Sequence, residues 1–357
     1  MRRILRIVKW LALSLVVVLL LLLAPVGYIE TFCRSEPEVQ AYTPKMTDPA
    51  FLRAEANSYL TYPEWHIVYA YEGLANVLKT GDDHAFGYGR SVAGFWASFC
   101  ALNQEAGRHG GADLDTRQTI HVIGVSFTLE MGMKALYEET LGRVFALVRG
   151  AEKSPQDRYA AAMAEDYGSF LHQTPWYKYD FDREVAALWS EPVTSLRGWE
   201  RRLALGGEWK AKAAYARVIA GAVAATTGQA QLRIRSLVAG LAPADLQTIP
   251  EVSVIEDRGA DGVLIETPRY RAFTLILQQI AARNGTVLEV AGNDDIMVSA
   301  LGATAPSQLG SATLIADINR DGFAGRRLLL QVKVTDLVAL FAELRAANLE
   351  LEHVYDY

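Results

Sequence analysis

The sequence predicts an α+β protein in three parts: an N-terminal transmembrane helix, an aromatic-rich and mostly helical domain, and a C-terminal ferredoxin-like α/β domain with extra strands. Three observations support this prediction. Residues 11–29 are uncharged and almost wholly apolar. Residues 51–245 place apolar side chains at helical spacing and are rich in aromatic residues. From about residue 250 onward, short alternating runs typical of strands flank two amphipathic helical patterns.

The N-terminal segment has the features of a single-pass membrane anchor. Residues 11–29 contain eight Leu and four Val, and a helix of this length spans about 28 Å, close to the hydrocarbon thickness of a bilayer. Basic residues precede this run, namely Arg2, Arg3, Arg6 and Lys9. No further Lys or Arg occurs before Arg34. The positive-inside rule therefore predicts that the N-terminus is cytoplasmic and that the rest of the chain after the apolar run lies outside the cytoplasm.

A cleaved signal peptide is the alternative interpretation of this segment. The apolar run is longer than a usual signal-peptide core, and no A-x-A cleavage site follows it. We therefore expect residues 1–30 to form a basic tip and an uncleaved anchor that contacts the lipid bilayer through residues 11–29. The Ala- and Arg-rich composition is compatible with a bacterial inner membrane, so we expect the bulk to face the periplasm.

Composition limits the classes of partner. Residues 10–357 carry 31 basic and 41 acidic side chains, a net charge of −10, which argues against a nucleic-acid partner. With 51% apolar residues, the chain can bury a sizeable core.

The two cysteines are Cys33 and Cys100. An oxidising compartment would permit a bridge between them, but two unpaired thiols are the simpler expectation.

The segment between anchor and domains reads as a linker. Residues 31–50 are polar and contain three prolines, Pro37, Pro44 and Pro49.

The helical domain is expected over residues 51–245. Its first long helix should begin at Thr61-Tyr62-Pro63-Glu64, which resembles a capping box with proline in the first turn. Asp115 should cap a second long helix, and Ser154-Pro155 should open another.

The C-terminal domain is expected over residues 246–357. Seven strands are predicted, over 251–256, 263–267, 286–290, 296–301, 314–318, 328–334 and 349–355. Helical patterns lie at 273–280 and from Thr335 onward. This order of strands and helices is that of a ferredoxin-like split βαβ unit with extra strands. Such folds serve enzymes, binding modules and oligomerisation domains, so the fold does not select a function.

Aromatic density points to a candidate ligand site. Tyr62 and Trp65 lie near the start of the first long helix, and Trp176 and Tyr177 lie in an aromatic loop between helices. Aromatic clusters with nearby carboxylates can line a carbohydrate or lipid groove. The alternatives are that these residues form part of the core, or that they surround a domain where it rests on a membrane.

Two histidines, His66 and His121, are weak candidates for catalysis. They lie on two different predicted helices, which could pack together and form a site with Trp65. No H-x-x-x-H or H-E-x-x-H pattern accompanies them. Two ordinary core or surface histidines are the simpler interpretation. On the helix that carries His121, Glu130 should pair with Lys134 one turn later.

Residues 317–322, Asp-Ile-Asn-Arg-Asp-Gly, resemble the first half of a calcium loop. Calcium prefers oxygen ligands, which Asp317, Asn319 and Asp321 would supply from alternate positions. The twelfth position is Leu328, where a bidentate Glu is needed. The alternative is a polar hairpin turn, so Ca²⁺ remains a secondary expectation and no other cofactor is predicted.

These patterns favour a membrane-tethered, extracytoplasmic binding or assembly protein with no catalytic activity. Besides the lipid bilayer, we expect the chain to bind another protein or a second copy of itself. The alternatives are an extracytoplasmic enzyme with a site near Trp65, His66 and His121, and a calcium-dependent module that uses the loop from Asp317 to Asp321.

Overall fold

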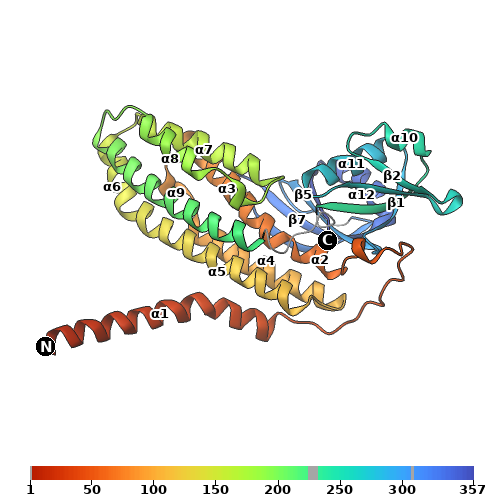
Figure 1. The fold of residues 1–357 in the computed structure, drawn as a ribbon, viewed down its shortest axis with the longest axis horizontal. Coiled ribbons are helices and arrows are strands. Elements are labelled where there is room, and N and C mark those ends of the chain that lie inside the picture. Colours follow the sequence, from red (N-terminus) through yellow and green to blue (C-terminus); the bar gives the residue numbers. More distant parts are fainter. Residues whose placement is uncertain (1, 224–231, 307–308) are drawn as a thin grey trace.

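The computed structural model describes residues 2–223, 232–306 and 309–357. Helices occupy one half of the molecule and two small sheets occupy the other, while α1 (Arg2–Phe32) extends below the helical half (Figure 1). The mostly helical N-terminal part and the strand-rich C-terminal part are therefore confirmed. Residues 224–231 of the predicted helical range 51–245 lie outside the described residues.

The helical half is a bundle of long helices joined by short connections. Its elements are α2 (Ala56–Leu60), α3 (Tyr62–Thr80), α4 (Tyr88–Arg108), α5 (Leu114–Tyr137), a π-helical turn η3 (Glu138–Gly142), α6 (Arg143–Arg149), α7 (Pro155–Leu171), η4 (Trp176–Lys178), α8 (Phe181–Ser190) and α9 (Leu196–Val223). The Ser154 side chain and the Asp157 side chain form the reciprocal capping box at the start of α7. Asp113, not Asp115, caps α5 through the Thr116 amide.

The capping box predicted at Thr61 is wrong. Thr61 has helical backbone angles and its hydroxyl donates to the carbonyl of Asn57 at 2.8 Å. The reason is that α2 runs directly into α3, so the amides at the start of α3 already have helical neighbours and need no side-chain cap.

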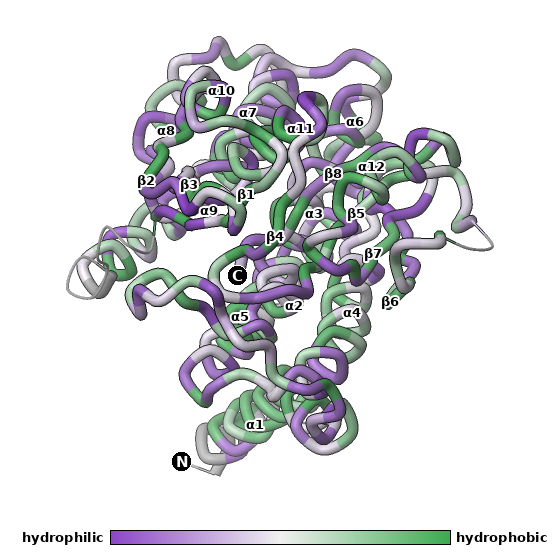
Figure 2. Tube along the Cα trace, turned by 90° about the vertical axis from the view of Figure 1, so that its right-hand side faces the viewer, coloured by the Kyte–Doolittle hydropathy of each residue, from purple (hydrophilic) through white to green (hydrophobic). Residues whose placement is uncertain are grey.

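Among the described residues, one helix, Arg6–Phe32 within α1, is long and apolar enough to cross a membrane by length and composition. Figure 2 shows α1 in the colours of hydrophobic residues over much of its length. Most of it projects away from the protein, but Ile29 near its C-terminal end is only 1% exposed and joins the core of the helical half. α1 is therefore docked at one end and exposed along most of the rest.

Cys33 and Cys100 form a disulfide, so the expectation of two unpaired thiols is wrong. The bond joins the residue after α1 to the middle of α4 across 67 positions of sequence. Asn103 strengthens this junction by donating from its side-chain amide to the Cys33 carbonyl at 2.7 Å. No local pattern could reveal the pairing, because it depends on where α1 ends relative to α4.

The predicted linker, residues 31–50, is extended after α1 and packs on the first sheet. The backbone amides of Lys45 and Met46 donate to the buried carboxylate of Glu289, at 2.6 and 2.9 Å. Met46 is 3% exposed and packs with Leu237 and Leu264. This segment therefore covers a sheet face that would otherwise meet water.

In the described residues, eight strands form two antiparallel sheets, whereas the sequence predicted one domain with extra strands. The first sheet has the order β2-β3-β1-β4 and comprises β1 (Arg233–Ala239), β2 (Ser253–Asp257), β3 (Val263–Pro268) and β4 (Thr286–Val290). The second has the order β6-β7-β5-β8 and comprises β5 (Asp295–Gly302), β6 (Ala312–Asn319), β7 (Arg326–Lys333) and β8 (Glu350–Tyr355). The strand that the sequence missed is β1, which lies in the range predicted to be helical.

The α-helices that accompany the sheets in the described part of this half are α10 (Pro243–Gln247), α11 (Arg271–Ala282) and α12 (Leu337–Ala346). Their apolar faces and one face of each sheet share a single core, which includes Val238, Phe273 and Leu330. The opposite face of the second sheet contributes Met297, Leu329 and Tyr355 to the core of the helical half. The second sheet thus joins the two halves, because alternate side chains along its strands pack into different cores.

Candidate functional site

A cavity of about 830 Å³ lies inside the helical half. Side chains from α3, α5, α7 and α9 surround it, and the segment from Gln173 to Tyr177 and the side chain of Tyr270 complete its wall. Ligand pockets in proteins have volumes of roughly 300–1,000 Å³. The cavity is therefore large enough for a small molecule.

The cavity wall is mainly apolar and aromatic. It includes Trp65 and Val68 of α3 and Ile123 and Phe127 of α5. On the loop side, the Trp176 ring packs on Tyr215 of α9, with ring centroids 5.3 Å apart. Such a wall favours a ligand with an apolar body.

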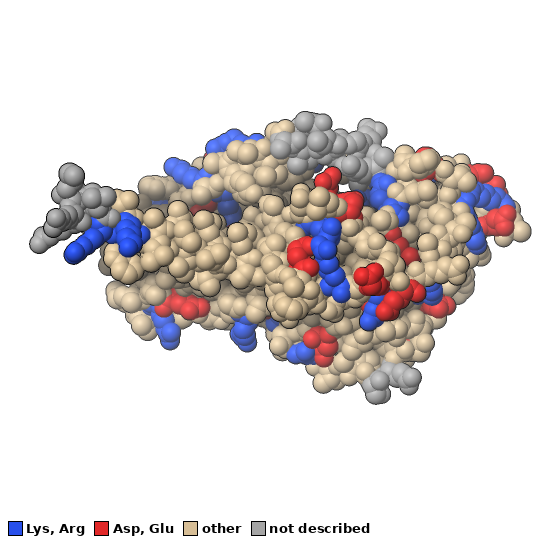
Figure 3. All heavy atoms as spheres, turned by 90° about the horizontal axis from the view of Figure 1, so that it is seen from below, with Lys and Arg blue, Asp and Glu red and all other residues tan. Residues whose placement is uncertain are grey.

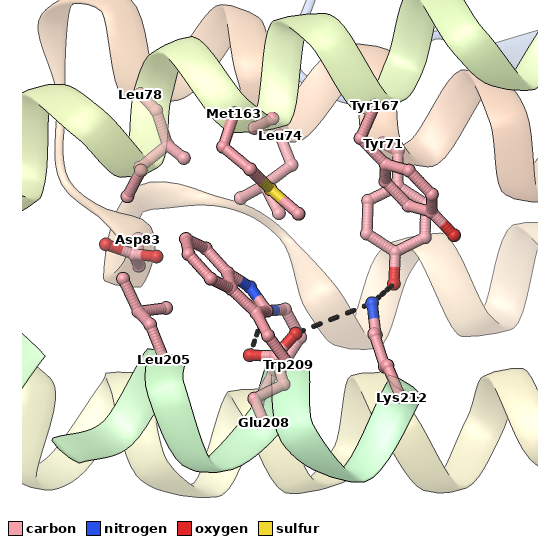
Figure 4. A pocket seen from close by; sticks show the side chains of 13 residues that line it. Tyr71, Leu74, Leu78, Asp83, Met163, Tyr167, Leu205, Glu208, Trp209 and Lys212 are labelled. Carbon is pink, nitrogen blue, oxygen red and sulfur yellow. Dashed lines mark hydrogen bonds and ion pairs between the residues drawn. The ribbon is translucent and has the colours of Figure 1, made fainter. Parts of the chain in front are cut away.

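The polar floor of the cavity is built by Tyr71, Glu130 and Lys212, which come from α3, α5 and α9. Lys212 Nζ lies 2.6 Å from a carboxylate oxygen of Glu130 and donates to the Tyr71 hydroxyl at 2.6 Å. The Tyr71 hydroxyl in turn donates to Glu130. Figure 4 shows Lys212 pointing toward Tyr71 beside a smaller neighbouring pocket.

The floor continues into a second ion pair. Glu208 accepts from Lys134 at 2.8 Å and lies 3.5 Å from Lys212 Nζ. Burial alone would raise the pKa of Glu208, but Lys134 and Lys212 lower it to about 2. Burial would likewise lower the pKa of Lys212, but Glu130, Tyr71 and Glu208 raise it well above its ordinary value. Glu208 and Lys212 are therefore ionised at neutral pH, and the cluster pairs two carboxylates with two lysines.

These contacts correct the expectation that Glu130 pairs with Lys134 along α5. Glu130 pairs with Lys212 and Lys134 pairs with Glu208, both on α9. Sequence spacing could not reveal this, because partners on another helix are closer and better shielded from water than the neighbour one turn along.

Three of the four predicted ligand-binding residues line the cavity, namely Trp65, Trp176 and Tyr177. Tyr62 does not; it is fully buried at the junction of α3 and the second sheet, with its ring 5.8 Å from that of Tyr355. The clustering of aromatic residues in the sequence thus identified part of the cavity wall. It did not distinguish aromatic residues that line the cavity from those buried in the core. The residues that sequence reasoning missed are Tyr71 and Lys212, for which no local signal exists.

His66 is buried beside the cavity wall but does not line it. Its Nε2 lies 2.9 Å from the Ser91 carbonyl oxygen and 3.9 Å from the Asp321 carboxylate. Burial lowers the pKa of His66 to about 4, although Asp321 and Ser91 oppose this shift. His66 is therefore neutral at physiological pH and joins α3 to α4 and to the β6–β7 turn.

His121 lies at the junction of α5 with α1. Its Nε2 contacts the Glu30 carboxylate at 2.8 Å, and its ring stacks on Trp96 at 6.5 Å between centroids. Like His66, it is not among the residues that line the cavity. The two histidines contact different polar partners, so their side chains do not converge on one site. An enzyme site between them stays a prediction.

The side chains of the predicted calcium loop point to different partners. Asp317 accepts from the Arg326 guanidinium at 2.7 Å, and Asn319 also accepts from Arg326. Asp321 lies instead against His66. The Gly322 carbonyl accepts from the Asn76 side chain at 2.8 Å, which ties the loop to α3. The contacts are those of a hairpin turn docked on the helical half.

Among the described residues, one group of metal-ligand type side chains lies close together, namely Glu55, His109 and Asp295 with ligand atoms within 4.8 Å of one another. His109 Nδ1 is 3.4 Å from Glu55, and its Nε2 is 3.5 Å from Glu105. Burial opposes a charge on His109, but hydrogen bonds to Glu105 and Glu55 raise its pKa to about 9. An imidazolium therefore supplies the positive charge that these carboxylates require.

This imidazolium should make stability depend on pH. Because the pKa of His109 is raised from 6.5 to about 9 in the folded state, its stabilising contribution is complete below about pH 6.5 and is lost as pH rises through 9. Denaturant unfolding of the full chain from pH 6 to pH 9.5 should show this loss, and His109→Gln should show a flatter profile. Parallel profiles for the two proteins would contradict the assignment.

No family model, no curated protein and no solved structure matches this chain.

Proposed function

We propose that this chain is a membrane-tethered binding protein whose cavity holds a small amphipathic molecule. The observation that carries the proposal is the 830 Å³ cavity with an apolar, aromatic wall and a charged floor of Tyr71, Glu130 and Lys212. A wall of this kind takes an apolar body, and the polar groups of the floor orient the ligand.

The charge balance of the floor supports a neutral polar group on the ligand. Lys212 already contacts Glu130 and Glu208, and Lys134 already contacts Glu208. A charged ligand group would have to compete with these pairs in a site shielded from water, where an unpaired charge is costly. A hydroxyl or amide can instead hydrogen-bond to the floor without displacing a charge.

The proposed topology is a cytoplasmic N-terminus with the folded part outside the cytoplasm. Two independent features support it. Basic residues flank only the N-terminal side of the apolar run of α1. The Cys33–Cys100 disulfide suits an oxidising, extracytoplasmic compartment. Residues 284–286, Asn-Gly-Thr, match an N-glycosylation acceptor, so the proposal extends to extracytoplasmic compartments in general and not only to a bacterial periplasm.

We further propose that the sheet half, residues 232–357, contains two related ferredoxin-like units. In each sheet the first strand along the chain lies between the third and the fourth. The first unit follows the order strand, helix, two strands, helix, strand from β1 to β4. The second has the same strand order from β5 to β8, with no helix between β5 and β6 in the described residues. This half supports the bundle through the second sheet.

The cavity can be tested by photolabelling of the purified full chain. The probe is a long-chain fatty alcohol that carries a diazirine, with an excess of the unlabelled alcohol as competitor. Label should enter Trp65 and Val68, which line the cavity and are 4% and 8% exposed. A fatty acid probe of the same chain length should label these residues less, because its carboxylate would have to compete with the ion pairs of the floor.

A pair of α5 variants separates cavity labelling from labelling of the outer surface. Ser126 lines the cavity, whereas Leu129 is 45% exposed and does not. Ser126→Phe should lower competed labelling of Trp65 and Val68 by about tenfold, equivalent to about 1.4 kcal/mol. Leu129→Phe should leave it unchanged. Equal labelling of both variants, or no competed label on α3, would refute the proposal.

A further inference from the structure

The outer surface of α5, η3 and α6 is mostly apolar between Val122 and Val148. Large hydrophobic side chains that are 45–74% exposed follow one another along it, namely Val122, Leu129, Met133, Leu136, Leu141, Val144, Leu147 and Val148. We call these eight residues the α5–α6 face. Single exposed hydrophobic residues are common on soluble proteins, but a continuous row of this size marks an interaction surface.

The α5–α6 face is a regular feature of the helix. At 100° per residue, the four members on α5 lie within about 60° of one another around the helix axis. The π-helical turn Glu138–Gly142 then changes the phase of the helix, and Leu141, Val144 and Val148 continue the exposed apolar row.

Three charged residues of α5 and η3 point inward. Glu130 and Lys134 pair with Lys212 and Glu208 on α9. The buried Glu138 pairs with Arg201 at 2.9 Å. This distribution is the reverse of that on a surface helix of a soluble protein, where the apolar side faces the core and the charged side faces water. It suits a helix whose outer environment is hydrocarbon.

The anchor helix places a bilayer beside this face. The end of α1 is fixed to the beginning of α5, because Glu30 contacts Arg117 at 3.2 Å and His121 at 2.8 Å. From there α1 runs back beneath α5 and separates from it toward the N-terminus (Figure 1). The stretch from His121 to Val148 and the stretch from Ile29 back to Arg2 are each about 40 Å long.

The charge distribution agrees with this placement. In Figure 3, seen from below, the largely uncharged α1 lies in front of the helical half, some charged side chains lie along the edges of this half, and acidic and basic groups gather over the other half. Between Val122 and Val148, the exposed charged residues are Glu139 and Arg143. They lie at and just after the π-helical turn, and long side chains such as that of Arg143 can extend their charge toward the headgroups.

We infer that the α5–α6 face contacts the acyl chains of the same bilayer that α1 spans. The helical half is then partly embedded along its underside and is not held above the membrane on a tether. The inference rests on α1 as a membrane span and does not require a ligand in the cavity. Val122 both lines the cavity and is 59% exposed on this face, so the cavity wall is continuous with the lipid-facing surface.

Nitroxide labels on single introduced cysteines test this inference in the full chain reconstituted into phosphatidylcholine vesicles. The native cysteines form a disulfide, so only the new thiol reacts. Test positions are Leu136→Cys and Leu147→Cys, with Leu19→Cys of α1 as the membrane reference. Glu165→Cys, on the polar side of α7 and 60% exposed, is the aqueous control. All four positions are exposed, so no core contact is removed.

The readout is relaxation of each label by oxygen, which concentrates in lipid, relative to a water-soluble nickel complex. The ratio at Leu136 and Leu147 should match that at Leu19 and exceed that at Glu165. An aqueous ratio at both test positions, with a lipid ratio at Leu19, would overturn the inference and leave the anchor intact. An aqueous ratio at Leu19 would overturn the anchor as well. Spin–spin broadening between labels at Leu136 of two molecules would show that a second copy covers the face, which also overturns it.

Discussion

Arg201→Met is expected to destabilise the helical half by about 3–5 kcal/mol, the usual cost of removing one partner from a buried ion pair. Arg201 is fully buried, and its guanidinium contacts Glu138 at 2.9 Å, Glu200 at 2.5 Å and Asp83 at 3.3 Å. Methionine fills a similar volume but leaves these carboxylates without their shared cation. The loss should be measured as the free energy of unfolding of the full chain in detergent.

Two further variants identify the cause of this loss. Arg217, which lies on α9 like Arg201, forms an exposed pair with Asp182 of α8, and Arg217→Ala should cost less than 1 kcal/mol. Glu138→Gln combined with Arg201→Met should be less destabilised than the sum of the single variants, because one of the unpaired charges is removed. A loss for Arg201→Met no larger than that for Arg217→Ala would contradict the structural role assigned to Arg201.

Replacing both cysteines by serine is expected to cost about 4 kcal/mol of stability. The Cys33–Cys100 bond closes a loop across 67 positions, and closing a loop of this size restricts the unfolded chain by about that amount in the chain-entropy model. The same change should loosen the end of α1 from α4, because the bond and the Asn103 contact with the Cys33 carbonyl form this junction.

Reductant provides the matched control for this prediction. Unfolding of the wild-type chain in the presence of reductant should approach that of the Cys33→Ser, Cys100→Ser variant, while the variant itself should not respond. Equal stability of the oxidised wild-type chain and the variant would show that the bond does not stabilise the folded state.

Several elements could be predicted because their signals are local. The apolar run of α1 needs no partner to be recognised, since its length and lack of charge suffice. The alternating patterns at 263–267 and 328–334 became β3 and β7. Strand β1 was missed because its apolar residues do not alternate: Leu237 and Val238 are consecutive, both are buried, and they pack into different clusters.

The candidate site was predictable only in part. Trp65, Trp176 and Tyr177 could be found because large aromatic residues in clusters line cavities as well as cores. The floor could not be found, since Tyr71 is 59 positions from Glu130 and 141 from Lys212. No spacing rule relates residues so distant, and each of them looks like an ordinary helix residue in its own segment.

Local sequence signals thus sufficed to predict the long apolar N-terminal helix, the helical and strand-rich halves, and several aromatic residues of the cavity wall. These features follow from side-chain periodicity and local backbone preferences, which any short segment carries within itself. Tertiary structure decided which charges pair, that the cysteines bond, that the strands divide into two sheets, and that the polar side of α5 turns inward. Each of these depends on which helices and strands touch, because a buried charge or thiol takes its partner from whatever packing brings close.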